Sequence, residues 1–141
     1  MTRTNPVVSR RRAILICAGV TMAMGQRASA GRTQTSRDQT FPDVVDVKAK
    51  SRGGGVFDFD VTVSSPYDTP ARYADAFRVR NRDGTVYGER ILLHDHQTEQ
   101  PFTRDLTGVA IPAGVSGVVV EGRDQKSGWG GKTLDVVLPG R

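Results

Sequence analysis

Alternation of apolar and polar residues over 56–64 is the feature that most restricts the fold of this sequence. Four apolar residues occupy odd positions and three polar residues occupy even positions: Phe57, Phe59, Val61 and Val63 against Asp58, Asp60 and Thr62. A period of two is that of a β-strand with one buried face. Asp58 and Asp60 are therefore interpreted as part of a solvated outer face and not as a catalytic acid–base pair.

Six further short apolar segments follow or precede this strand. They cover residues 44–47, 73–80, 86–93, 102–106, 117–122 and 132–138. Turn residues separate them, and none shows the 3.6-residue period of a helix. Seven strands at a spacing of roughly 8–12 residues predict an all-β fold, an antiparallel two-sheet sandwich. A closed barrel is the alternative, but it is expected to show more continuous alternation.

The second half of the chain resembles fibronectin type III and immunoglobulin-like modules. Residues 117–124, a glycine-rich loop and residues 133–138 resemble the last two strands of such a module, over about a third of residues 31–141. The resemblance implies a sandwich of about seven strands and no activity. The sequence departs from the immunoglobulin pattern because it lacks a cysteine pair. The stretches His-Asp-His and Gln-Pro-Phe-Thr-Arg are similar to those of small exported bacterial proteins of unknown activity.

Residues 1–30 predict a secretory signal peptide. Basic residues up to Arg12 precede an apolar stretch over 13–24, and the segment closes on Ala28-Ser29-Ala30. Cleavage after Ala30 leaves residues 31–42 as a flexible linker and residues 43–141 as the sandwich domain. The arginines at 10–12, followed by apolar residues, resemble a twin-arginine export signal. The expected location is therefore the periplasm or the exterior of the cell.

Charge and cysteine usage exclude several classes of protein. The net charge of +5 belongs to the first 30 residues, because residues 31–141 hold 15 basic and 15 acidic residues. No nucleic-acid partner is therefore expected. No apolar run approaches the roughly 18 residues of a membrane span, so no span is expected after cleavage. The only cysteine, Cys17, follows Ile16, whereas lipid attachment requires a small residue at that position.

His94 and His96, the only histidines, are a candidate metal site. Residues i and i+2 of an extended chain face the same way, so both imidazoles can present nitrogens to one cation. Glu99 or Asp95 can add oxygens, and this donor set suits copper or zinc. No third histidine exists, and two exposed histidines at a strand end need no ligand. No cofactor is therefore predicted, and a copper or zinc site is kept as the alternative.

The hairpin at Asn81–Thr85 decides whether these histidines are accessible. Its sequence suits a three-residue loop that closes on Gly84. Counting outward from this loop pairs Val79 with Tyr87, which places three residues on the core side: Tyr87, Ile91 and Leu93. The same register leaves His94 and His96 accessible. A two-residue turn at Asp83-Gly84 reverses the assignment, and the sequence leaves both registers open.

The glycine-rich loop over 124–131 is a candidate binding surface. Trp129 is flanked by glycines and can be an exposed anchor for a partner, with Asp124 and Lys126 beside it. In the competing interpretation Trp129 covers the open end of the core, where its ring buries the most area. The sequence leaves both interpretations open.

These features predict a small exported accessory or binding module without catalytic activity. No serine-nucleophile turn, phosphate loop or dinucleotide motif occurs in the sequence. The ligand is an unidentified protein or small molecule. The alternative function is that of a periplasmic copper- or zinc-binding protein that uses His94 and His96.

Overall fold

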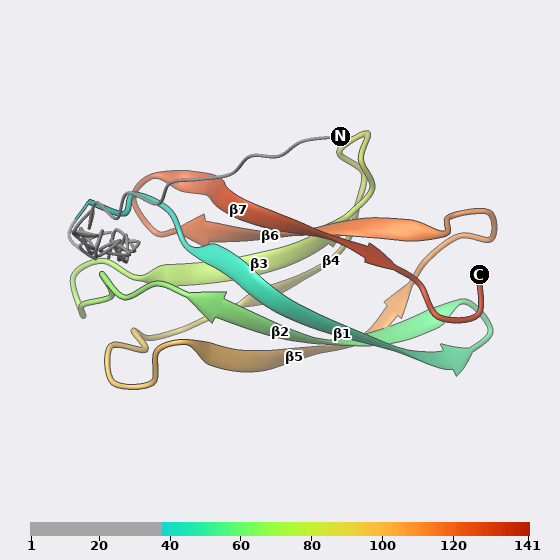
Figure 1. Cartoon of the computed structure of the whole chain (residues 1–141), viewed down its shortest axis with the longest axis horizontal. Coiled ribbons are helices and arrows are strands. Elements are labelled where there is room, and N and C mark those ends of the chain that lie inside the picture. Colours follow the sequence, from blue (N-terminus) through green and yellow to red (C-terminus); the bar gives the residue numbers. More distant parts are fainter. Residues whose placement is uncertain (1–37) are drawn as a thin grey trace, which may run out of the picture. The chain divides into compact units, whose positions relative to one another are not determined.

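Seven strands in two antiparallel sheets make up residues 38–141, the part of the chain that the computed structural model describes. The strands are β1 (Asp43–Gly53), β2 (Val56–Ser64), β3 (Ala74–Arg80), β4 (Val86–Ile91), β5 (Phe102–Ala110), β6 (Gly117–Asp124) and β7 (Gly128–Val137). One sheet has the order β1-β2-β5 and the other the order β4-β3-β6-β7 (Figure 1). The predicted antiparallel sandwich is confirmed.

The predicted signal peptide lies outside the described residues, and so does most of the predicted linker. The division into residues 1–30, 31–42 and 43–141 therefore stays a prediction. Within residues 38–141, no helix is long and apolar enough to span a membrane.

The alternation over β2 positions the core as the sequence predicts. Its four odd-numbered apolar side chains are at most 2% exposed, and they pack with Phe77 and Val79 of β3 and Val118 and Val120 of β6. Asp60 is exposed on the outer face. Asp58 lies on the same face, where it accepts hydrogen bonds from Arg52 Nε and Gly108 N.

The hairpin between β3 and β4 has the predicted loop. Asn81 N donates to Thr85 O at 2.7 Å, and Gly84 N donates to Asn81 O at 3.1 Å. Gly84 adopts φ +96°, which glycine tolerates far better than residues with a Cβ. The three-residue loop is therefore confirmed.

A β-bulge directly after this loop makes the predicted register wrong. Arg80 pairs with Val86, but Val79 pairs with Gly88 and not with Tyr87. Tyr87 is thus the extra residue, and every later residue of β4 is displaced by one position relative to a regular hairpin. A bulge of this kind places two residues opposite one and reverses the faces beyond it.

The bulge reverses the exposure of the residues that follow. Leu92 is 5% exposed, whereas Ile91 and Leu93 are 49% and 83% exposed, the opposite of the prediction. His96 is buried at 2% exposure and only His94 is exposed. Because β4 ends at Ile91, the period of two no longer applies to the two histidines.

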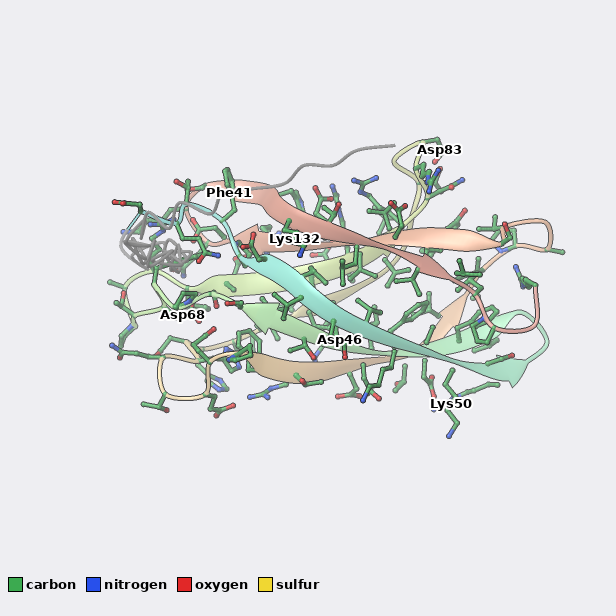
Figure 2. The ribbon with its side chains drawn as sticks, viewed as in Figure 1. Phe41, Asp46, Lys50, Asp68, Asp83 and Lys132 are labelled. Atoms are coloured by element: carbon green, nitrogen blue, oxygen red, sulfur yellow. The ribbon has the colours of Figure 1, made fainter. Side chains whose placement is uncertain are left out.

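Residues 39–42 lead into β1 and contact the sandwich closely. Gln39 Nε2 donates to Phe41 O and to Ser64 O. A Cβ on Gly130 of β7 would lie 2.6 Å from Cδ1 of Phe41, so only glycine lets Phe41 approach this strand (Figure 2). The end of the predicted linker is therefore held against the sandwich.

Candidate functional site

The connections at the two ends of the sandwich have different structures. The network end contains residues 38–42 and the connections 65–73, 92–101 and 125–127. The groove end contains the connections 54–55, 81–85 and 111–116, together with residues 138–141. The sequence-predicted site residues lie at or beside the network end.

Asp68 joins two connections at the network end. Its side chain is buried; Oδ1 accepts a hydrogen bond from Ala74 N and Oδ2 accepts one from His96 N, both at 3.0 Å (Figure 2). Its two oxygens therefore hold connection 65–73 against connection 92–101. The sequence alone did not identify Asp68 as a site residue, because the amide of His96 that it binds is 28 residues away.

Asp124, a predicted binding residue, is also a structural carboxylate. It is 1% exposed and accepts hydrogen bonds from Lys126 N, Ser127 N and Arg72 Nε. Burial alone would raise the pKa of Asp124, but the amides of Ser127 and Lys126 and the Arg72 guanidinium together lower it. Arg72 also lies over the ring of Tyr67, 4.5 Å from its centroid.

Lys126 and Trp129, the other predicted binding residues, have different surroundings. Lys126 is exposed on connection 125–127. Trp129 lies in β7, where it pairs with Arg123 of β6. The Cζ atoms of Arg78 and Arg123 lie 4.0 and 5.3 Å from its ring centroid. Trp129 is thus neither in an end loop nor part of the core, because β7 begins earlier than the sequence indicates.

The ring of Trp129 belongs to a layer of paired charges outside the four-stranded sheet. Arg78 and Arg80 both donate to Oε2 of Glu121, at 2.8 and 2.9 Å. Burial would raise the pKa of Glu121, but the two guanidinium groups outweigh it and lower that pKa. The arginines around Trp129 are thus already engaged with carboxylates of the same face.

The two histidines of the candidate metal site have adjacent rings that are tilted against each other. Their ring centroids are 4.8 Å apart with an interplanar angle of 31°, whereas His96 stacks on Phe102 at 3.8 Å. Burial lowers the pKa of His96, and its Nδ1 is buried without a hydrogen-bond partner among the described residues. Glu99 instead binds Arg104 at 2.8 Å. Among residues 38–141, no group of three or more His, Cys, Asp or Glu side chains is arranged to hold a metal ion.

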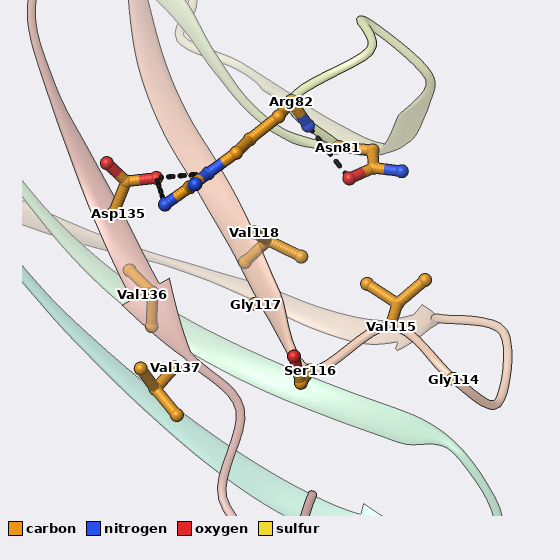
Figure 3. Close-up of a pocket in the computed structure, with 10 residues that line it drawn as sticks. All are labelled: Asn81, Arg82, Gly114, Val115, Ser116, Gly117, Val118, Asp135, Val136 and Val137. Carbon is orange, nitrogen blue, oxygen red and sulfur yellow. Dashed lines mark hydrogen bonds and ion pairs between the residues drawn. The ribbon is translucent and has the colours of Figure 1, made fainter.

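A groove of about 430 Å³ lies at the groove end (Figure 3). Ten residues line it: Asn81, Arg82, Gly114, Val115, Ser116, Gly117, Val118, Asp135, Val136 and Val137. The Arg82 side chain reaches Asp135 at 3.0 Å, and Val137 is 80% exposed. The sequence gives no signal for this groove, because residues from β6, β7 and two connections distant in sequence meet there.

Comparison with known proteins gives one informative relative. A protein from Halomicrobium mukohataei named "Putative lipoprotein" is 42% identical over 108 residues, which are 76% of this chain and 53% of that protein. The chain therefore spans about half the length of this relative. No protein-family model matches the chain, and no solved structure matches it.

Proposed function

We propose that this chain is an exported, non-catalytic β-sandwich module that binds a partner at its groove end. The observation that carries the proposal is the position of the groove. Residues 38–42 enter at the network end, whereas the groove lies at the opposite end, beside the exposed Val137. A partner can therefore approach the groove without contacting residues 38–42.

Export is supported by the predicted signal peptide and by the similarity to the Halomicrobium mukohataei protein, whose name describes a lipoprotein. We propose cleavage after Ala30, twin-arginine export and a final location in the periplasm or outside the cell. The residue before Cys17 favours release over lipid attachment, because Ile16 is not small.

Fractionation of cells that express the full chain tests export. Replacement of Arg10, Arg11 and Arg12 by lysine is expected to hold the precursor in the cytoplasm, since this pathway recognises the arginine pair. Cys17→Ser is expected to leave the location unchanged. Normal export of the triple variant would contradict the twin-arginine route. Loss of membrane association on Cys17→Ser would identify a lipid anchor instead.

The strand order supports a fibronectin type III-like assignment within the sandwich class. In constant-type immunoglobulin domains the fourth strand joins the sheet of the first, second and fifth strands. Here β4 pairs with β3 and extends the sheet that contains β6 and β7. We therefore propose that the module is closer to fibronectin type III domains than to constant-type immunoglobulin domains.

Site-specific photo-crosslinking in native cells tests partner binding. A photoreactive amino acid at Val137, in the groove, is expected to capture a discrete partner. The matched control is Val45, which is 41% exposed on β1 near the network end. Equal products at both positions, or none at Val137, would contradict the proposal.

Metal binding by His94, His96 and Glu99 stays the alternative function. The closeness of the two rings and the unpartnered Nδ1 of His96 favour it. Glu99, the third candidate ligand, is paired with Arg104 and would have to leave that pair to bind a copper or zinc ion.

A further inference from the structure

Arg141, four residues after β7, makes an unusual set of contacts at the groove end. Its guanidinium donates to three backbone carbonyl oxygens of the connection between β5 and β6. Nη2 lies 2.9 Å from Ile111 O, and Nη1 lies 3.1 Å from Val115 O and also contacts Pro112 O. Three acceptors from one short segment thus converge on a single cation.

An aromatic ring and a glycine complete the surroundings of this guanidinium. The Cζ atom of Arg141 lies 5.1 Å from the ring centroid of Phe57, within the range of a cation–π contact. Gly55 adopts φ +82°, and a Cβ there would lie 3.1 Å from Nη2 of Arg141. None of the ion pairs between described residues includes Arg141. Among the described residues, the positive charge of Arg141 is therefore stabilised by carbonyl oxygens and an aromatic ring, and by no carboxylate.

This arrangement suits a guanidinium better than an ammonium group. Guanidinium is planar, carries five N–H donors in a fixed geometry and is weakly hydrated, so it binds dispersed acceptors and flat rings at a low desolvation cost. A lysine ammonium is compact and strongly hydrated. The carbonyl oxygens and the ring around Arg141 therefore favour a guanidinium group over an ammonium group as the ligand.

The Arg141 contacts adjoin the groove. Gly114, Val115 and Ser116 line both the groove and a second hollow of about 360 Å³ that Arg141 also lines. Val115 supplies one of the three carbonyl oxygens. A segment lying in the groove therefore passes beside Val115, which carries one of the three acceptors.

We infer that the carbonyl oxygens of Ile111, Pro112 and Val115, with the ring of Phe57, form a binding site for an arginine side chain. Arg141 occupies this site from within the chain, and an arginine of a partner segment in the groove competes with it. The identity of the competitor rests on the proposed function, whereas the guanidinium site rests on the contacts of Arg141 alone.

Chemical rescue of the full chain tests the site. In Arg141→Ala, methylguanidinium at millimolar concentration is expected to raise the thermal midpoint saturably by several degrees and to shift the amide resonances of residues 111–115. Methylammonium at the same ionic strength is expected to do neither. Wild type and Arg82→Ala serve as matched controls, since the site stays filled in both. Arg141→Gln repeats the test with a longer polar side chain.

The outcomes separate this inference from the proposed function. Absence of a saturable shift in both Arg141 variants, or an equal shift with methylammonium, would overturn the guanidinium site even if Val137 captures a partner. Rescue together with tighter binding of an arginine-containing peptide than of its lysine counterpart would support the site. That result would stand even if no partner is captured at Val137.

Discussion

The two ends of the sandwich connect the same strands but stabilise their connections by different means. At the network end, the buried carboxylates of Asp68 and Asp124 bind backbone amides. At the groove end, glycines with positive φ form the turns, among them Gly55 and Gly84. Buried carboxylates therefore hold the connections at the network end, whereas glycine turns and the guanidinium of Arg141, which binds carbonyl oxygens, hold those at the groove end. Exposed side chains of the groove such as Arg82 can vary at little cost, which suits a binding surface.

Truncation of the shared core is expected to have the largest effect and to remove both ends together. Phe59 is fully buried, so Phe59→Ala should lower the free energy of unfolding by about 3–5 kcal/mol. Urea unfolding followed by Trp129 fluorescence measures the loss, and hydrogen exchange reports on each end separately. Phe77→Ala is expected to lower the free energy of unfolding to a similar extent and to reduce protection at both ends. Loss of protection at one end alone would show that the ends are not parts of one cooperative unit.

Asp68→Ala and Arg82→Ala compare the two ends directly. Loss of the Asp68 carboxylate leaves the buried amides of Ala74 and His96 unpaired, at an expected cost of about 2–4 kcal/mol. Arg82 is 79% exposed in its pair with Asp135, so its removal should cost about 0.5 kcal/mol or less. Equal losses in urea unfolding would contradict the distinction between the ends.

Acid is expected to weaken the network end through Asp124. The folded-state pKa of Asp124 is below its ordinary value of 3.8, so the unfolded chain takes up the proton first as the pH falls. The stabilising contribution is complete above about pH 4 and is lost as the pH falls through the folded-state pKa. Unfolding midpoints of wild type and Asp124→Asn should therefore converge on acidification. A constant difference between them would contradict this role, and exposed Asp60→Asn is the control.

The smallest expected effect concerns the histidine pair. Because Glu99 is paired with Arg104 and Nδ1 of His96 is buried, we expect the thermal midpoint to be unchanged by zinc or copper. A bound metal at a hundredfold excess over its dissociation constant would instead stabilise the chain by about 2.7 kcal/mol. A rise in midpoint that His94→Ala and His96→Ala abolish would establish the metal-binding alternative.

Much of the fold was predictable because its signal is local. The predicted strand over 56–64 coincides with β2, and the turn chemistry around Gly84 identified the hairpin loop. β1, β5 and β7 extend beyond their predicted ranges. The candidate site was less predictable. Asp124 and Trp129 were singled out as binding residues, but partners distant in sequence give both of them structural contacts.

The sequence by itself determined the sandwich, because burial on one face of a strand imposes a period of two that adjacent residues display. The tertiary structure alone decided the bulge at Tyr87 and hence the burial of Leu92 and the exposure of Ile91. It also decided the amides that Asp68 binds and the meeting of Arg141 with connection 111–116. These contacts join residues far apart in the chain, and their energies depend on which groups are brought together away from water. No local pattern encodes that choice.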